Sequence, residues 1–115
     1  MIYPKYFSKD RDINFWVPTQ SLSDLQYSDG TSEEKYLEQC VRKAKDLSCH
    51  SVELASFIRD WPSEFHFTSK RSNLLRPLQW DQCESVLELG AGCGAITRFL
   101  GETIPNVVAI EGSHQ

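Results

Sequence analysis

The chain has 115 residues, 40% of them hydrophobic, which is sufficient for one compact domain and too short for two. Its formal net charge is −4 and its positive residues are spread along the chain, so no basic tail or stripe indicates a nucleic-acid partner. The N-terminal stretch MIYPKYFSKD lacks the apolar run of a signal peptide, and no later segment has the length needed to span a bilayer. These features predict a soluble, cytoplasmic protein without a membrane span.

Residues 1–30 mix aromatic and polar turn residues, which predicts irregular or short extended structure. An amphipathic helix is predicted from Thr31, because Thr31 and Glu34 have the spacing of a capping box. On the same helix, Glu38 and Arg42 have the spacing of a favourable ion pair. The apolar residues that share one face of this helix are Leu37, Cys40, Val41 and Ala44.

A second helix is predicted after LSCHS and should end at Pro62, because the residue before a proline is steered away from helical geometry. The stretch TSKRSNLLRPL predicts a short third helix, with Thr68 or Ser69 as its cap and Pro77 as its stop. Residues 1–80 are therefore predicted to form a mainly helical N-terminal region. The apolar residues at helical spacing in the second helix are Leu54, Phe57, Ile58 and Trp61.

The pattern changes after Trp80. SVLEL and NVVAI are short apolar runs, GAGCG between them is a turn suited to glycine and alanine, and AITRFLGE has helical spacing. Residues 81–115 are thus predicted to form a βαβ unit, which gives an α/β fold. Two parallel strands with one helix leave a sheet face uncovered, and the sequence ends directly after the second strand. We therefore expect a truncated domain, the N-terminal fragment of a longer protein, rather than cover from the N-terminal helices or from a second copy.

The glycine-rich turn predicts a ligand site. Gly90, Gly92 and Gly94 allow the backbone to bend sharply from strand to helix and allow a ligand to approach the main chain. Glu111, directly after the second strand, is placed to accept hydrogen bonds from both hydroxyls of a ribose. Both features lie at the carboxyl edge of the predicted sheet, so an adenosine-containing cofactor is expected.

The glycines alone leave the identity of the cofactor open. GAGCGA also fits the dinucleotide fingerprint GxGxxG/A, with Ala95 as its last member. The third glycine, however, falls at Gly94, and Glu88 stands two residues before the first glycine, where its carboxylate would repel a pyrophosphate. The amino group and sulfonium of S-adenosylmethionine would instead be attracted. Electrostatics therefore favour a cation-bearing cofactor over NAD.

VLELGAGCG followed by VVAIEGS resembles the first two motifs of class I S-adenosylmethionine-dependent methyltransferases, over about Ser85 to Ser113. The resemblance implies the first βαβ unit of a Rossmann-like domain and S-adenosyl-L-methionine as cofactor. It also implies that Glu88 orients the methionine end, that Glu111 holds the ribose hydroxyls, and that the turn surrounds methionine and ribose. The turn residues concerned are Gly90, Ala91, Gly92 and Gly94.

Upstream, IRDWPSEFHFTSKRSNLLRPL resembles the segment before the first motif in bacterial methyltransferases found near, or fused to, glycosyltransferases of surface-polysaccharide synthesis. This resemblance implies a saccharide or other small-molecule acceptor and a glycosyltransferase as partner or fused domain. The sequence contains half of such a cofactor site and no residue to which catalysis can be assigned. We therefore expect the 115-residue chain alone to be inactive.

The remaining polar and aromatic residues favour structural roles. Lys70, Arg71 and Arg76 are interpreted as a solvated face. His66, between aromatic residues, is interpreted as a packed ring rather than a general base. Trp61 and Trp80 are interpreted as core residues. The cysteines form no CxxC pair and the histidines no ligand-like spacing with them, which predicts no metal site and free, mostly buried thiols. The cysteines are Cys40, Cys49, Cys83 and Cys93, and the other two histidines are His50 and His114.

Two other functions remain open at this point. One is an NAD(P)-dependent oxidoreductase or sugar epimerase that uses the dinucleotide reading of the glycine turn. The other is a non-catalytic interaction module, in which the helical region docks a protein partner and the βαβ unit is only structural.

Overall fold

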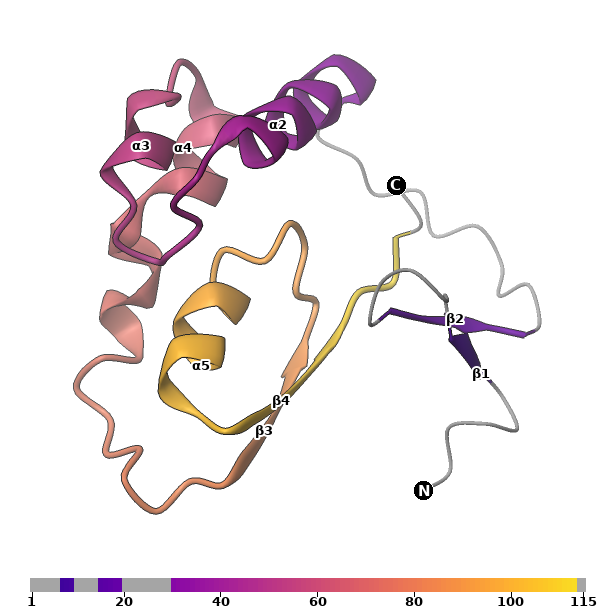
Figure 1. Ribbon diagram of the computed structural model, residues 1–115, viewed down its shortest axis with the longest axis vertical. Helices are drawn as coiled ribbons and strands as arrows, with labels where there is room; N and C mark the ends of the chain where they lie inside the picture. The colour runs from indigo at the N-terminus through magenta and orange to yellow at the C-terminus, as the bar shows by residue number, and fades with distance from the viewer. Residues whose placement is uncertain (1–6, 10–14, 20–29, 114–115) are drawn as a thin grey trace.

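The computed structural model describes residues 7–9, 15–19 and 30–113. In Figure 1 the helices α2, α3 and α4 lie together at the top, and α5 lies beneath them beside β3 and β4. The predicted α/β class is confirmed: after the short strands β1 and β2 the described chain is helical, and strand, helix and strand follow. In the described ranges no helix is long and apolar enough to cross a membrane. The elements are β1 (Phe7–Lys9), β2 (Trp16–Pro18), α2 (Thr31–Lys43), α3 (Val52–Ser56), α4 (Trp61–Phe67), the 3-10 helix η1 (Ser69–Leu74), β3 (Ser85–Leu89), α5 (Thr97–Thr103) and β4 (Asn106–Ile110).

Short extended structure was predicted for residues 1–30. The described part of this region contains β1 and β2, which pair antiparallel with Ser8 opposite Val17. Lys9 places its ammonium group 5.9 Å from the centre of the Trp16 ring, across the same pair of strands. The prediction is confirmed for these strands, and the rest of residues 1–30 lies outside the described residues.

Helix α2 begins differently from the prediction. Its N-cap is Gly30, whose φ is +115° and whose carbonyl oxygen accepts the N–H of Glu34 at 3.0 Å. Thr31 is already inside the helix and no side chain caps it, so the predicted capping box is wrong. Glycine takes the cap position because this backbone conformation is unfavourable for a side chain such as that of threonine. The predicted ion pair is confirmed, with Arg42 Nη2 2.8 Å from Glu38 Oε1 on an exposed surface.

The first hydrophobic core lies between α2, α3 and α4. Tyr36 and Ala44 pack at its edge, and the Tyr36 hydroxyl donates to the carbonyl oxygen of Phe57 at 2.7 Å. Val41 was predicted on the buried face but is 39% exposed, because it lies beyond the edge of the stripe that α3 and α4 cover. The buried core residues are Leu37, Cys40, Leu54 and Phe67.

The single helix predicted to run up to Pro62 is instead two helices. Helix α3 ends at Ser56, and α4 starts at Trp61 with Pro62 in its first turn, where a proline needs no N–H partner. Asp60 and Ser63 form a capping box: Asp60 Oδ1 accepts the N–H of Ser63 at 3.0 Å, and Ser63 Oγ accepts the N–H of Asp60 at 3.1 Å. As the first residue of α4, Trp61 is 64% exposed, so its predicted core role is wrong.

The third predicted helix is confirmed as the 3-10 helix η1. Thr68 caps it, since its hydroxyl oxygen accepts the N–H of Lys70 at 3.3 Å, and the helix ends at Leu74, before Pro77. Trp80, predicted in the core, packs on the second core described below and donates its indole N–H to the carbonyl oxygen of Leu75 at 3.0 Å. The segment between η1 and β3 is therefore attached to the body of the protein.

The predicted βαβ unit is confirmed in its element order and in its parallel pairing. In the β3–β4 register, Val86 lies opposite Val107 and Leu89 opposite Ile110. Val86 and Val107 face α5 and pack on the second core. The buried residues of that core are Cys49, Phe99, Leu100 and Ile104.

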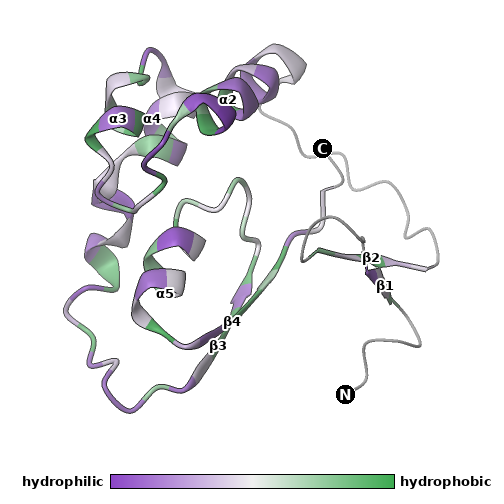
Figure 2. Cartoon of the chain, viewed as in Figure 1, coloured by the Kyte–Doolittle hydropathy of each residue, from purple (hydrophilic) through white to green (hydrophobic). Residues whose placement is uncertain are grey.

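The other face of the β3–β4 pair is exposed, as predicted from two strands and one helix. Its four apolar side chains alternate with those that face α5, and each is more than two-fifths exposed. Figure 2 shows green, hydrophobic stretches along these strands. We refer to this surface as the open sheet face. Its residues are Leu87 (57% exposed), Leu89 (72%), Val108 (41%) and Ile110 (49%).

Polar contacts connect the helical region to α5. The N–H of Cys49 donates to Glu102 Oε1 at 2.7 Å, and the Cys49 thiol donates to Glu102 Oε2 at 3.0 Å. Burial raises the pKa of this thiol, which keeps it a donor. The Arg98 guanidinium donates to the carbonyl oxygens of Ser48, at 3.3 Å, and His66, at 2.9 Å. The beginning of α5, and with it the glycine turn, is thereby fixed against α4.

The cysteines are free, as predicted, but they are less buried than predicted. Cys40 and Cys49 are buried, Cys83 is partly buried and Cys93 is exposed. Cys93 lies in the glycine turn and is exposed.

Candidate functional site

The glycine turn joins β3 to α5. Residues with a side chain adopt its backbone conformation only at a cost in free energy. Gly90, Gly92 and Gly94 have φ values of +71°, +55° and +80°. For residues with a side chain, this left-handed region costs about 1–2 kcal/mol. The N–H groups of Gly90 and Ala91 both donate to the carbonyl oxygen of Ile110, at 2.8 and 3.1 Å, which ties the turn to the end of β4.

Glu111 lies against this turn, as predicted from its place after β4. Its Oε2 accepts the N–H of Gly92 at 2.7 Å, and its Oε1 accepts the N–H of Ser113 at 2.8 Å. The Ser113 and Gly92 amides lower the pKa of the Glu111 carboxyl, so the group is ionised at neutral pH. A carboxylate offers about four acceptor positions. The two backbone bonds therefore leave capacity for further hydroxyl donors.

Glu88 lies on the face of β3 that carries α5. It is half-buried, and its Oε2 accepts the hydroxyl of Thr97 at 2.6 Å. Thr97 is the first residue of α5, three residues after Gly94, and sequence reasoning did not assign it a role. The signal that could have identified it is the position itself: a hydroxyl in the first turn after a glycine loop, facing an acidic residue of the preceding strand.

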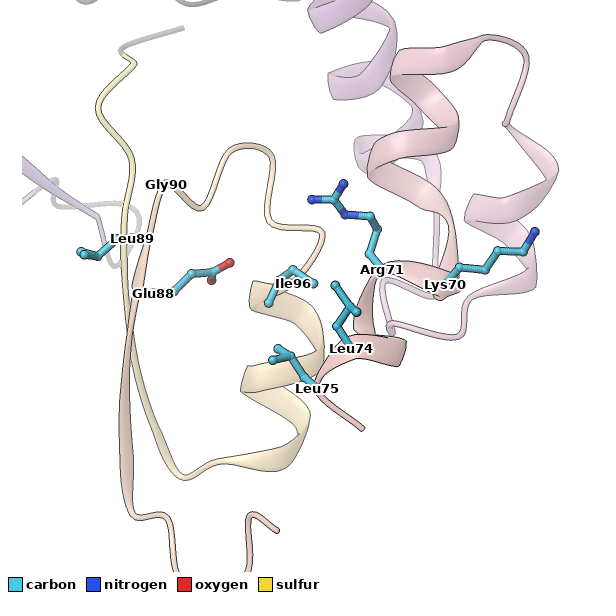
Figure 3. Close-up of a pocket in the computed structure, with 8 residues that line it drawn as sticks. All are labelled: Lys70, Arg71, Leu74, Leu75, Glu88, Leu89, Gly90 and Ile96. Atoms are coloured by element: carbon cyan, nitrogen blue, oxygen red, sulfur yellow. The ribbon is translucent and has the colours of Figure 1, made fainter. Parts of the chain in front are cut away.

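A cavity of about 570 Å³ opens beside Glu88, between the end of β3, the start of the glycine turn, the start of α5 and η1. Figure 3 shows Glu88 extending from β3 toward α5 and Arg71 extending from η1 toward the glycine turn, while Lys70 points away. We call this the η1–β3 pocket. It is lined by Lys70, Arg71, Leu74, Leu75, Glu88, Leu89, Gly90 and Ile96.

Five of the six sequence-predicted site residues fall into two adjacent groups. The sixth, Gly94, closes the turn by donating its N–H to the carbonyl oxygen of Ala91 at 3.0 Å. Glu88 and Gly90 line the η1–β3 pocket. Ala91, Gly92 and Glu111 meet at the end of β4 through the backbone bonds described above. The two groups are consecutive along one turn, so a single elongated ligand could contact both.

The basic residues are not all a solvated face, contrary to the prediction. Arg71 is half-buried, with its guanidinium carbon 3.6 Å from the centre of the Phe65 ring. Arg76 is also half-buried and donates to the Ser72 hydroxyl at 2.7 Å. Only Lys70 is exposed. Spacing along the chain could not predict this, because the aromatic partner of Arg71 belongs to another helix.

His66 is a buried ring beside the turn, as predicted, and is 7% exposed. It meets Phe65 edge to face at 5.0 Å between ring centres, and its Cε1 would lie 3.8 Å from a Cβ added at Gly92. Within the described part of the chain, no group of three or more His, Cys, Asp or Glu side chains is placed to hold a metal ion.

No protein-family model matches the chain, and neither the curated proteins nor the solved structures give a match. Its function is therefore inferred from the geometry of the turn and of the η1–β3 pocket.

Two glycines offer a matched test of the turn. An added Cβ meets nothing within 4 Å at Gly90 or at Gly101, but Gly90 has a φ of +71° while Gly101 lies in α5 without a positive φ. We expect Gly101→Ala to stabilise the protein by about 0.5–1 kcal/mol and Gly90→Ala to destabilise it by about 1–2 kcal/mol. Urea denaturation measures both changes. Equal effects of the two substitutions would contradict the conformational role of Gly90.

The Glu111 carboxylate gives a pH-dependent prediction. Because backbone N–H groups lower its pKa in the folded protein, its stabilising contribution is complete above its ordinary pKa and is lost as pH falls through the lowered value. We expect the Gly92 amide resonance to shift in this acid range in an NMR titration. Glu111→Gln should abolish the shift. A Gly92 resonance that titrates in the range of an unperturbed carboxyl would contradict the prediction.

Proposed function

We propose that the chain is the N-terminal part of an S-adenosylmethionine-dependent methyltransferase. One observation carries the proposal: at the carboxyl ends of two adjacent parallel strands, a turn of three positive-φ glycines lies between two carboxylates, Glu88 and Glu111. Open α/β sheets bind ligands at this edge. Two carboxylates at that position suit a ligand that carries positive charge and hydroxyl donors rather than a pyrophosphate.

The residues present fit such a cofactor. Open space lies in front of Gly90, where a ligand can approach the main chain. Glu88 would accept the amino group of the methionine end, and Glu111, with acceptor capacity beyond its two backbone bonds, would accept the ribose hydroxyls. When bound, S-adenosylmethionine supplies an electrophilic methyl group.

The catalytic contribution expected of this chain is positional. In a direct methyl transfer, rate enhancement comes chiefly from holding the acceptor and the methyl donor close and in line. The contacts of Arg98 with Ser48 and His66 fix the start of α5 and support a rigid turn for that purpose. A saccharide or other small molecule is the proposed acceptor, with a glycosyltransferase as partner or fused domain.

The open sheet face supports the proposal that β3 and β4 are the first strands of a larger Rossmann-like sheet. Parallel sheets are normally covered on both faces, whereas the four apolar side chains of this face are between 41% and 72% exposed. Further strands and helices would cover that face and complete the cofactor site. It follows that the 115-residue chain alone should not transfer methyl groups.

The test is calorimetric titration of S-adenosylmethionine, S-adenosylhomocysteine and NAD into two proteins: the 115-residue chain and the product of the complete reading frame that encodes it. We expect the complete product to bind the S-adenosyl compounds in preference to NAD. Preference for NAD would favour an oxidoreductase or epimerase. If neither protein binds any of the three compounds, the methyltransferase proposal is wrong, and the open sheet face becomes the lead to a protein partner.

A further inference from the structure

We propose that Trp61 and Phe65, two aromatic residues of α4, form a surface that binds a pyranose ring of the acceptor. This inference rests on the proposed function, in which the acceptor is a saccharide or another small molecule, and it commits to the saccharide. We call these two residues the α4 aromatic surface. Neither is among the residues assigned to the cofactor, and Trp61 was predicted from the sequence to lie in the core.

The indole of Trp61 is accessible although it is held in place. Trp61 is 64% exposed, and its ring centre lies 5.3 Å from that of Phe65, with the two ring planes inclined by 34°. The capping box that starts α4 is formed by Asp60 and Ser63, so the helix does not need the Trp61 side chain at this position. The indole is therefore free to contact a ligand without a change in the fold.

The chemistry of this surface suits a sugar ring. The face of an aromatic ring carries negative charge density. The C–H groups on one side of a pyranose are weakly positive and form a flat apolar patch, so they stack on such a face. The hydroxyl groups around the ring edge then require polar partners.

Polar partners of both kinds flank the α4 aromatic surface. Glu64 is exposed and lies three residues after Trp61, on the same side of the helix. The Arg71 guanidinium carbon lies 3.6 Å from the centre of the Phe65 ring. A carboxylate accepts hydrogen bonds from hydroxyl groups, and a guanidinium donates to their oxygens.

The balance of charge favours a neutral ligand. Glu64 contributes one negative group and Arg71 one positive group, so neither a strongly anionic nor a strongly cationic ligand is selected. An apolar helix of a protein partner would cover both groups and take them out of water without a partner, which is unfavourable. A neutral polyol with one apolar face satisfies the aromatic rings and both charged groups together.

The α4 aromatic surface lies next to the proposed methyl donor. Arg71, which contacts Phe65, also lines the η1–β3 pocket and extends toward the glycine turn (Figure 3). His66, the residue after Phe65, packs beside Gly92 of that turn. A saccharide on α4 would thus be held close to the ligand of the turn, as methyl transfer requires.

The experiment is an NMR titration of the complete reading-frame product, carried out without S-adenosylmethionine. The probes are methyl β-D-glucopyranoside and methyl β-D-galactopyranoside, with the open-chain polyol D-sorbitol and benzyl alcohol as comparators. The indole N–H signal of Trp61, assigned by its loss in Trp61→Phe, reports binding. We expect at least one pyranoside to shift this signal, and D-sorbitol, which has no apolar ring face, to leave it unchanged.

Four variants separate ring stacking from apolar area. Trp61→Ala should weaken binding of the pyranoside about tenfold. Trp61→Leu keeps an apolar side chain without a ring face and should behave like the alanine variant, whereas Trp61→Phe should retain part of the affinity. Phe15→Ala, at an aromatic side chain that is 56% exposed in another part of the chain, should change nothing. Calorimetric titration measures the four affinities, and circular dichroism checks that each variant is folded.

The outcomes separate this inference from the proposed function. If the protein binds S-adenosylmethionine but neither pyranoside shifts the Trp61 signal, the inference is wrong and the proposed function stands. A shift caused by benzyl alcohol alone would also overturn the inference, because the surface would then be a general apolar contact for a protein partner. Equal affinity of Trp61→Leu and the unaltered protein would overturn the stacking role. If a pyranoside binds at Trp61 but S-adenosylmethionine does not bind, the saccharide surface stands and the methyltransferase proposal is wrong.

Discussion

Replacing Phe99 by alanine is expected to lower the free energy of unfolding by about 3–5 kcal/mol, as large truncations in a packed core do. Phe99 is 6% exposed and belongs to the core that joins α5 to β3 and β4. Its ring meets Trp80 edge to face, 6.3 Å between centres, and the Arg76 guanidinium lies 5.2 Å from it. A cavity at this point would loosen both the sheet contact and the segment before β3.

The size of this effect matters because small domains are stable by only about 5–15 kcal/mol. Loss of Phe99 should therefore unfold a measurable fraction of the protein under native conditions. Phe99→Leu keeps most of the apolar volume and should cost less than about 1.5 kcal/mol. Leu78→Ala, at a side chain that is 52% exposed, should stay within about 0.5 kcal/mol. Urea denaturation of the three variants tests this order.

The prediction would be contradicted if Phe99→Ala lowered the free energy of unfolding by less than Phe99→Leu does. It would mean that the βαβ unit does not depend on this core and that the open sheet face, with its four exposed apolar side chains, reflects a loosely packed unit. If Phe99→Ala lowers the free energy of unfolding by the expected amount of about 3–5 kcal/mol, one face of the two strands is firmly packed while the other is open.

The sequence predicted the elements of the βαβ unit well, for a physical reason. β3, the glycine turn and β4 are set by local signals: short apolar runs and a turn whose backbone requires glycine. The meeting of Glu111 with the turn also followed, because the carboxyl ends of adjacent parallel strands share one sheet edge. These predictions need only the chain order and the geometry of a parallel pair.

The helical region was harder to predict because competing local signals decide its boundaries. Pro62 can end a helix or occupy the first turn of one. Here the Asp60–Ser63 capping box starts a helix at this point, and that capping box was not among the sequence predictions. Gly30 replaced Thr31 as the cap of α2 in the same way. The exposure of Trp61 follows directly from the first of these two boundaries.

The least predictable part of the site was the wall supplied by η1. The place of Arg71 in the η1–β3 pocket depends on its contact with Phe65 and on the packing of η1 beside β3. Neither can be obtained from spacing along the chain, because they are tertiary contacts between elements with no periodic signal in common. A cluster of basic residues is therefore ambiguous until its neighbours in space are known.

Replacing Glu88 by alanine is expected to change ligand preference in opposite directions. Binding of S-adenosylmethionine should weaken about ten- to hundredfold, the usual effect of losing a hydrogen bond to a charged group. Binding of NAD should become stronger, because the carboxylate that repels a pyrophosphate is gone. Calorimetric titration of both compounds into the complete reading-frame product measures the two changes.

Glu88 also has a structural partner, so the substitution needs a control that separates the two roles. Its Oε2 accepts the Thr97 hydroxyl at 2.6 Å, and Glu88→Gln retains an oxygen acceptor for that bond while it removes the charge. If charge decides the preference, the glutamine and alanine variants should behave alike. Glu84→Gln, at an exposed carboxylate before β3, should change neither affinity.

The two cofactor assignments differ most sharply at this residue. A variant that loses S-adenosylmethionine and gains NAD identifies Glu88 as the group that selects a cationic ligand. A variant that gains NAD while S-adenosylmethionine binding stays unchanged would instead favour the oxidoreductase or epimerase, since the carboxylate would then only hinder the ligand that the turn accepts. Because both assignments use the same glycine turn, a charge beside that turn can distinguish them, and Glu88 lines the pocket next to it.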